Sequence, residues 1–166
     1  MAENPPETPP ETPPENPPER PLVIHSQYIK DFSFENPNAP EIFTALAEQT
    51  PVLNITLDVQ PRQLNERTYE VVLLLRVQAE VQKKTTFLVE LDYAGVVKVA
   101  DTVPESDVEP LLMIEAPRYF FPFARNVLAM VTRDGGFPPL VINPIDFEQF
   151  YEQHKKTSAP AAAAQA

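Results

Sequence analysis

The sequence predicts an α+β domain: a four-stranded antiparallel sheet with a long crossover after the first strand, followed by two to three helices packed on one face. The first observation behind this prediction is that apolar residues recur at every second position in the first half of the chain. The second is that the period becomes helical after Pro104. The third is that nine of the 21 prolines fall within the first 21 residues, outside the predicted strands.

Four segments alternate apolar and polar side chains, which is typical of strands with one face on a core and one in water. They are Ile24–Glu35, Leu53–Gln60, Tyr69–Gln82 and Thr86–Val99. The apolar residues of the first strand that are expected to face the core are Ile24, Tyr28, Phe32 and Phe34.

The connections between these strands differ in length. Residues 81–85 and 61–66 are short enough for hairpins. Residues 36–51 are too long for a tight turn and contain Pro37, Pro40 and Pro51, which cannot continue a ladder. This segment is therefore expected to be a crossover.

A helix is predicted after Pro104, because Ser106 and Glu109 have the spacing of a capping box and Pro110 follows near the first turn. Pro117 is expected to end or kink this helix at Ala116.

Two further helices are predicted. One covers about residues 121–133 and ends before Gly135 as its C′ residue. Its apolar face is expected to hold Phe123, Val127, Met130 and Val131. The last helix is expected to begin with Asn143 as N-cap and Pro144 in the first turn, stacking Phe147 over Tyr151.

The chain divides into a domain over residues 22–154 and two segments expected to be disordered. Residues 1–21 form a Pro/Glu-rich leader with a four-residue Pro-Pro-Glu repeat, which favours a solvated, extended polyproline II chain and does not resemble a signal peptide. A P-x-x-P ligand is an alternative interpretation of the leader. Residues 155–166 form an Ala-rich tail. No apolar run approaches the ~20 residues that span a bilayer, so we expect a cytoplasmic protein without direct membrane insertion.

The composition argues against several classes of function. The formal net charge of −11 argues against nucleic-acid binding. The chain has no cysteine, two histidines and three glycines, so thiolate metal sites and glycine-rich phosphate loops are excluded. His25 and His154 are expected at exposed positions, and Asp31 and Glu35 lie about 13 Å apart on a strand, too far for a carboxylate dyad. We therefore expect no enzyme activity, no catalytic residue, no cofactor and no metal.

Apolar residues on predicted polar faces point to protein binding instead. Val72 and Leu74 lie on such a face, where a second buried layer is an equally open explanation. Leu88, between Thr86 and Glu90, suits the docking of another protein. The predicted helices also carry more large apolar groups than one small sheet covers, which indicates an oligomer.

Five motifs, in order along the chain, resemble the bacterial protein-export chaperone family SecB. They are residues 28–40 (YIKDFSFENPNAP), 69–73 (YEVVL), 87–90 (FLVE), 121–125 (FPFAR) and 136–140 (GFPPL). The resemblance extends over about residues 24–151. It implies a homotetramer, a dimer of dimers, that holds unfolded precursor proteins without ATP and delivers them to the SecA motor ATPase.

The resemblance also implies two sets of site residues. By similarity, the SecA-binding residues are Asp31, Glu35, Leu88 and Glu90. The client-binding residues are Phe43, Leu53, Ile55, Leu57, Phe147 and Tyr151, of which the three on the second strand are equally good core candidates. This chain departs from the family in its longer leader, in a crossover without tryptophan, and in a tail that is uncharged after Lys156. The alternative is a SecB-like module retargeted to a dedicated partner such as a toxin, but the matching docking residues favour export.

Overall fold

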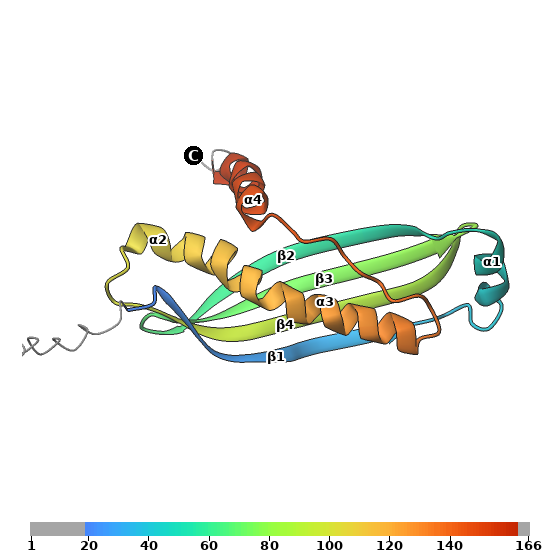
Figure 1. Cartoon of the computed structure of the whole chain (residues 1–166). Helices are drawn as coiled ribbons and strands as arrows, with labels where there is room; N and C mark the ends of the chain where they lie inside the picture. The colour runs from blue at the N-terminus through green and yellow to red at the C-terminus, as the bar shows by residue number, and fades with distance from the viewer. Residues whose placement is uncertain (1–18, 163–166) are drawn as a thin grey trace, which may run out of the picture.

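The computed structural model describes residues 19–162, and its centre is one four-stranded sheet (Figure 1). The strands, in chain order, are β1 (Leu22–Glu35), β2 (Val52–Asn65), β3 (Thr68–Val81) and β4 (Lys84–Val99). All neighbours are antiparallel, in the spatial order β1-β4-β3-β2. The predicted α+β class with an antiparallel sheet is confirmed.

Helical segments follow the strands in the chain, and the longest of them lies along one face of the sheet. They are α2 (Glu105–Pro110), a π-helical turn η1 (Leu111–Glu115), α3 (Ala116–Asp134) and α4 (Phe147–Ala162). Figure 1 shows α3 running along the sheet and the segment after it returning toward β2 before α4 begins. Among residues 19–162, no helix is both long enough and apolar enough to cross a membrane.

The connections agree with the sequence prediction. Because β1 pairs with β4, residues 36–51 must cross from one edge of the sheet to the other, and they contain the short helix α1 (Ile42–Glu48). The β3–β4 hairpin turns at Gln82 and Lys83, whose φ values of 51° and 63° fit a two-residue type I′ turn. Strand β2 is longer than predicted and continues through Pro61, which an edge strand tolerates.

Pro117 was expected to end or kink a helix at Ala116, and the helix does not end there. The chain stays helical from Glu105 to Asp134, with the π turn immediately before the proline. There the N–H of Ala116 donates to the carbonyl of Leu111, five residues earlier. This wider turn replaces regular α-helical hydrogen bonds directly before Pro117, where the proline ring obstructs them. The predicted capping box is also absent, because the Ser106 hydroxyl donates to the neighbouring Asp107 carboxylate (3.0 Å).

The ends of the last two helices differ in detail from the prediction. Gly136, with φ of 91°, takes the left-handed C′ position that was assigned to Gly135. The N–H of Phe137 donates to the carbonyl of Thr132 (3.0 Å), which completes a Schellman motif. Helix α4 begins at Phe147, later than the predicted Asn143 and Pro144, because the Asp146 carboxylate accepts the N–H of Gln149 (3.0 Å) as N-cap.

The C-terminal boundary of regular structure lies further on than expected. Residues 155–162, expected to begin a disordered tail, continue α4. The ammonium group of Lys155 lies 4.2 Å from the centre of the Tyr151 ring one turn earlier, a cation–π contact that favours this extension. Residues 1–18 of the predicted leader and residues 163–166 of the predicted tail lie outside the described residues.

The face of α3 that packs on the sheet agrees only in part with the prediction, since Val127 and Val131 pack against the core but Phe123 and Met130 do not. Phe120, Ala124 and Leu128 are fully buried, whereas Phe123 and Met130 are 54% and 46% exposed. The reason lies in β4, where a Cβ on Gly95 would come within 2.2 Å of the Phe120 ring. The missing side chain lets this ring lie directly on the strand, and that contact fixes the rotation of the helix.

Strand β1 contains two irregularities that its apolar pattern conceals. Its register against β4 shifts by one residue between Ile24 and Ser26 and again between Ile29 and Asp31. Ile24 and Phe34 therefore pack against the core as predicted, and Phe32 lies on the same face of the sheet but is 39% exposed. Tyr28, which lies between the shifts, faces the opposite side. A bulge reverses the alternation of side chains, and no local sequence pattern marked it.

Candidate functional site

The face of the sheet that points away from α3, called here the outer face, brings the four predicted SecA-binding residues together. Glu35 lies directly opposite Leu88, and Glu90 lies opposite Ser33 in the next outward-facing row. Asp31 follows one row further along β1. Asp31, Glu35 and Glu90 are exposed, whereas Leu88 is half-buried. All four side chains therefore lie on one face of the sheet.

One arginine lies within this acidic group. Arg76 of β3 is 2.8 Å from the Asp92 carboxylate and 3.8 Å from that of Glu90. Within residues 19–162, no ion pair involves Asp31 or Glu35, so most of the negative charge is free to attract a basic partner.

A shallow hollow beside Leu88 adds an apolar contact to this charge. Its volume is about 180 Å³, and it is lined by Leu88, Glu90, Arg76, Gln78, Thr56 and three neighbours. A half-buried leucine surrounded by carboxylates offers the apolar centre and polar rim of a protein interface. We call Asp31, Glu35, Leu88 and Glu90 the docking surface.

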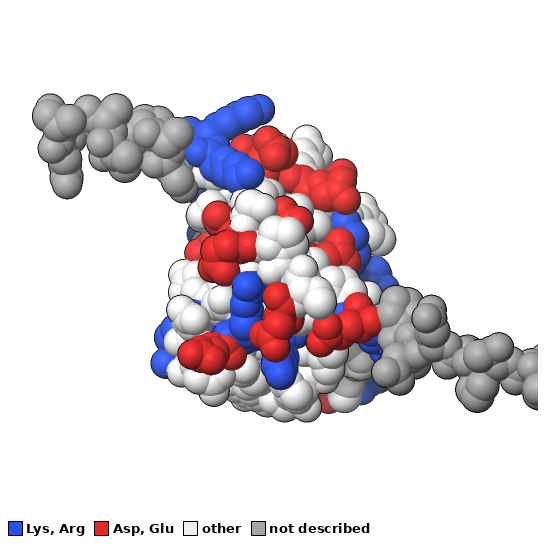
Figure 2. Space-filling model, turned by 90° about the vertical axis from the view of Figure 1, so that its left-hand side faces the viewer, with Lys and Arg blue, Asp and Glu red and all other residues white. Residues whose placement is uncertain are grey.

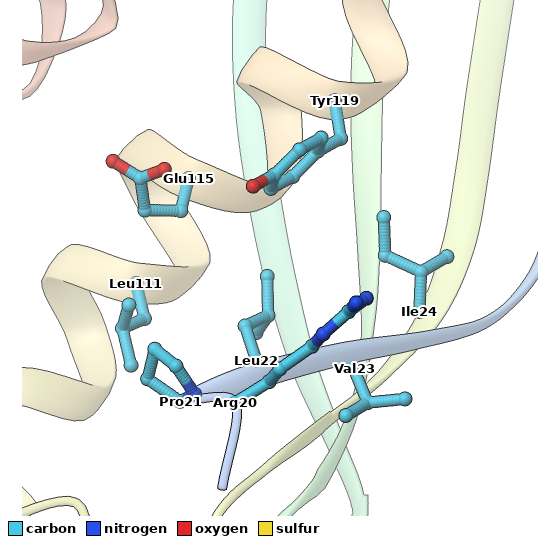
Figure 3. A pocket seen from close by; sticks show the side chains of 8 residues that line it. All are labelled: Arg20, Pro21, Leu22, Val23, Ile24, Leu111, Glu115 and Tyr119. Carbon is cyan, nitrogen blue, oxygen red and sulfur yellow. The ribbon is translucent and has the colours of Figure 1, made fainter. Parts of the chain in front are cut away.

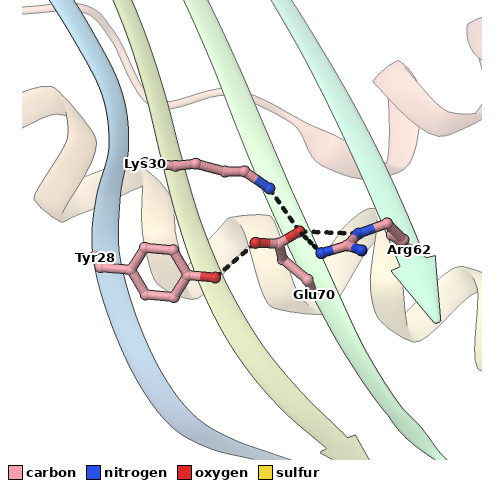
Figure 4. A network of polar contacts seen from close by, with 4 residues as sticks. All are labelled: Tyr28, Lys30, Arg62 and Glu70. Atoms are coloured by element: carbon pink, nitrogen blue, oxygen red, sulfur yellow. Dashed lines mark hydrogen bonds and ion pairs between the residues drawn. The ribbon is translucent and has the colours of Figure 1, made fainter. Parts of the chain in front are cut away.

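Further along the outer face, a network of polar side chains joins three of the four strands (Figure 4). The buried Glu70 carboxylate of β3 accepts a hydrogen bond from the Tyr28 hydroxyl (2.6 Å) and one from the Lys30 ammonium (2.7 Å). Arg62 of β2 donates to it through Nη2 (2.9 Å) and Nε (3.2 Å). Figure 4 shows the two β1 side chains reaching over β4, where Ala94 leaves room for them. We call these four residues the Glu70 network.

The network perturbs the acidity of its members. The hydrogen bonds from Lys30 and Tyr28 lower the pKa of Glu70 from 4.5 to about 2. The hydrogen bond to the same carboxylate raises the pKa of Tyr28. The sequence analysis missed this network, because Glu70 is one of several acids on a polar face and Tyr28 was expected in the core. Only the register of β1 brings these residues together.

The six predicted client-binding residues do not gather in one place. Phe147 and Tyr151 are 2% and 3% exposed and belong to the core of the chain, so they present no open surface. Leu57 is half-buried, whereas Leu53 and Ile55 are exposed on β2. Phe43 of α1 is exposed and packs against Phe137, with 5.3 Å between the ring centroids.

A cavity of about 340 Å³ does lie beside Leu53. It is lined mainly by apolar side chains from α1, β2, β4 and the segment after α3: Leu46, Pro51, Leu53, Phe87, Phe137, Pro138, Pro139, Leu140 and Val141. The sequence analysis noted residues 136–140 as a motif but assigned them no contact. The tertiary structure adds this segment to the apolar surface, because the Schellman turn directs it back across the sheet.

A second cavity, of about 400 Å³, lies between β1 and the helices (Figure 3). Leu22 and Ile24 line it on the strand side, and Leu111, Glu115 and Tyr119 on the helix side. Among residues 19–162, no strand pairs with the outer edge of β1, beside which this cavity lies.

Charge is not confined to the docking surface. Figure 2 shows acidic side chains, with basic ones among them, over the end of the molecule that carries α2 and the β2–β3 turn. Arg67 and Glu105 lie 3.5 Å apart at this end. Because acidic side chains are widespread, charge alone does not distinguish the docking surface. What distinguishes it is the alignment of β1 with β4, which sets its carboxylates beside Leu88.

Comparisons with known proteins agree with these features. The family model described as "Preprotein translocase subunit SecB" matches residues 15–158. The chain is 50% identical over 143 residues to the protein-export protein SecB of Parvibaculum lavamentivorans, covering 86% of this chain and 84% of that protein. It is 47% identical over 145 residues to that of Rhodospirillum rubrum, covering 87% and 89%.

A solved structure shows the same fold at low sequence identity. It is a SecB-like chaperone of Mycobacterium tuberculosis in complex with a peptide from an antitoxin, with a TM-score of 0.62 and 12% identity over 75% of this chain and 90% of that one. The resemblance that the sequence motifs predicted is confirmed. The chain belongs to the SecB family of protein-export chaperones.

Proposed function

We propose that this protein holds unfolded precursor proteins on its apolar cavity and delivers them to the SecA ATPase through the docking surface. The observation that carries the proposal is the register that sets Glu35 opposite Leu88 and Glu90 in the adjacent row. A basic surface on SecA would meet free carboxylates around one apolar side chain, an arrangement that supplies both attraction and orientation.

The two activities use different sides of the sheet. Leu53 and Phe87, which line the cavity, lie on the side of the sheet that α3 covers, whereas the docking surface lies on the outer face. A client and SecA can therefore bind at the same time. Unfolded chains share exposed apolar side chains, so a mainly apolar cavity binds many sequences without recognising one. Phe43 and Ile55 extend this apolar surface, whereas the burial of Phe147 and Tyr151 removes them from the proposed contact set.

We propose a homotetramer, a dimer of dimers, as the working form. Three large apolar side chains on α3 support this assembly: Tyr119 and Phe123 are each 54% exposed, and Met130 is 46% exposed. A stripe of this kind on a long helix favours burial against a second copy. Sedimentation should give a tetramer at micromolar concentration, and a monomer would contradict the assembly.

The proposed role includes no chemical step and no cofactor, and it places the protein in the cytoplasm, where unfolded precursors await export. Holding a client requires only reversible burial of apolar surface.

The decisive experiment reverses one charge of the docking surface. Glu90→Lys puts a second cation beside Arg76, 3.8 Å from the present carboxylate, and should weaken SecA binding at least about tenfold while unfolded-precursor binding persists. The matched control is Glu66→Lys, the same change in the β2–β3 turn at the other end of the sheet, which should leave both affinities unchanged. Undiminished SecA affinity in Glu90→Lys would refute the docking surface, and a wild-type protein that binds no unfolded precursor would refute the function.

A further inference from the structure

The docking surface joins two strands, so its shape depends on how β1 is aligned with β4. Asp31 and Glu35 come from β1, and Leu88 and Glu90 from β4. In the N-terminal part of β1, Leu22 pairs with Val99, so the two residue numbers sum to 121. At the other end Glu35 pairs with Leu88, and the sum is 123. The two bulges of β1 account for this shift of two residues.

Each bulge is needed for the observed alignment. If only one were lost, the alternation would reverse beyond it, so that Asp31 and Glu35 would face the core and Phe32 and Phe34 would face outward. If both were lost, the faces would be kept but β1 would slide by two residues, about 7 Å along β4. Ser33 instead of Glu35 would then lie opposite Leu88.

The Glu70 network is compatible only with the bulged strand. Without bulges, Tyr28 and Lys30 would follow Ile24 onto the core face, because all three have even numbers. The first bulge turns Tyr28 outward, and the second, at Lys30, returns Phe32 to the face of the sheet that α3 covers. Both outward side chains are held by the same carboxylate, Glu70 Oε1 at 2.6 Å and Oε2 at 2.7 Å. The Glu70 side chain is only 6% exposed, so its ion pairs are poorly replaced by water.

We infer that Glu70 is a positioning residue for partner docking: through Tyr28 and Lys30 it holds the bulged register of β1 and so aligns Asp31 and Glu35 with Leu88 and Glu90. This inference rests on the proposed docking of SecA. Glu70 lies about four outward-facing rows from Leu88, since Glu70 pairs with Val96 across β4, and it acts on the docking surface through the strand and not by contact.

Two substitutions test the inference with opposite changes of charge. Glu70→Gln removes a negative charge from the outer face, and Lys30→Met removes a positive one. If charge alone mattered, Lys30→Met would strengthen binding to a basic partner. If the network sets the register, both variants weaken SecA binding by about tenfold. The double variant should then bind SecA no more weakly than the single variant with the larger loss of affinity, because both substitutions disrupt the same network.

A conservative variant and a remote one serve as controls. Lys30→Arg keeps a cation able to donate to Glu70 and should retain the affinity for SecA. Glu66→Gln makes the same chemical change as Glu70→Gln in the β2–β3 turn, further from the docking surface, and should have no effect. Client binding should persist in all variants, which shows that they remain folded.

The register itself is measured by backbone NMR contacts between β1 and β4. In the wild type, contacts between Asp31 and Asp92 and between Glu35 and Leu88 are expected, and in Glu70→Gln and Lys30→Met they should weaken or move. Unchanged contacts in both variants would overturn the inference, as would altered contacts with unchanged SecA affinity. A wild-type protein that shows the expected contacts but does not bind SecA would instead overturn the proposed function.

Discussion

The Glu70 carboxylate makes the free energy of unfolding depend on pH, and the substitution Glu70→Gln separates its contribution from those of the other carboxylates. Its pKa is 4.5 without partners and about 2 in the folded protein. Because the folded-state pKa is the lower one, the carboxylate contributes its full stabilisation above about pH 5.5. That contribution is lost as the pH falls through 4.5 toward 2. The difference between these two pKa values corresponds to about 3 kcal/mol of stabilisation at 1.36 kcal/mol per unit.

The assay compares urea unfolding of the wild type and Glu70→Gln at one fixed protein concentration, from pH 6 to pH 3. The difference between their unfolding free energies should shrink by about 2 kcal/mol over this range, because more than half of the stabilisation by the Glu70 carboxylate is lost before the pH reaches 3. The amide introduced by Glu70→Gln does not titrate, so the other carboxylates cancel in the comparison. A glutamine control, Glu80→Gln, makes the same change on the same face of β3, where the carboxylate meets only the Gln78 amide (2.6 Å).

The result that would refute this reasoning is a difference independent of pH. A direct titration of the Glu70 side-chain carbon by NMR provides the second test, with an expected midpoint near pH 2. A midpoint near 4.5 would show that Lys30 and Tyr28 do not hold the carboxylate in solution as they do in the structure.

Three further predictions concern packing and client binding. Gly95→Ala should destabilise the protein by about 1–3 kcal/mol in thermal unfolding, since its Cβ would lie 2.2 Å from the Phe120 ring. Adding Phe120→Leu should restore part of the lost stability. An unchanged melting temperature in Gly95→Ala would contradict the close packing of Phe120 on β4. Thr132→Val should cost about 1–3 kcal/mol and speed amide exchange at Leu140, whose N–H donates to the Thr132 hydroxyl (2.9 Å), whereas Thr132→Ser should not. Leu53→Ser, at a 41% exposed position, should lower affinity for unfolded precursors while changing stability by no more than about 0.5 kcal/mol; equal affinity in a titration would exclude this cavity.

The elements that could be predicted were those set by local pattern. Alternation in residues 69–82 and 86–99 identified the two central strands, because both strands have one face on a continuous core. Leu88 was recognised as an apolar residue on a polar face, and the structure places it on the outer face. In contrast, the expectation that Pro117 would end or kink a helix did not include the π turn directly before it, through which the chain stays helical.

The pattern of apolar and polar residues could not predict contacts between residues far apart in the sequence. The apolar face predicted for residues 121–133 combined Val127 and Val131, which pack against the core, with the exposed Phe123 and Met130, since helical periodicity does not say which of two apolar faces meets the sheet. That choice depends on Gly95, a residue in another element whose missing side chain admits Phe120. Phe147 and Tyr151 were likewise assigned to a groove, and the structure buries them.

By itself, the sequence determined the class of fold, the order of its elements, the family motifs and which residues are apolar or charged, because these follow from period, composition and short-range chemistry. Only the tertiary structure decided how β1 is aligned with β4, and with it the outward position of Tyr28, the Glu70 network and the pairing of Glu35 with Leu88. The physical reason is that a bulge costs little locally and leaves no signature of its own. Its position is fixed by a buried carboxylate 40 residues away from Lys30 in the chain.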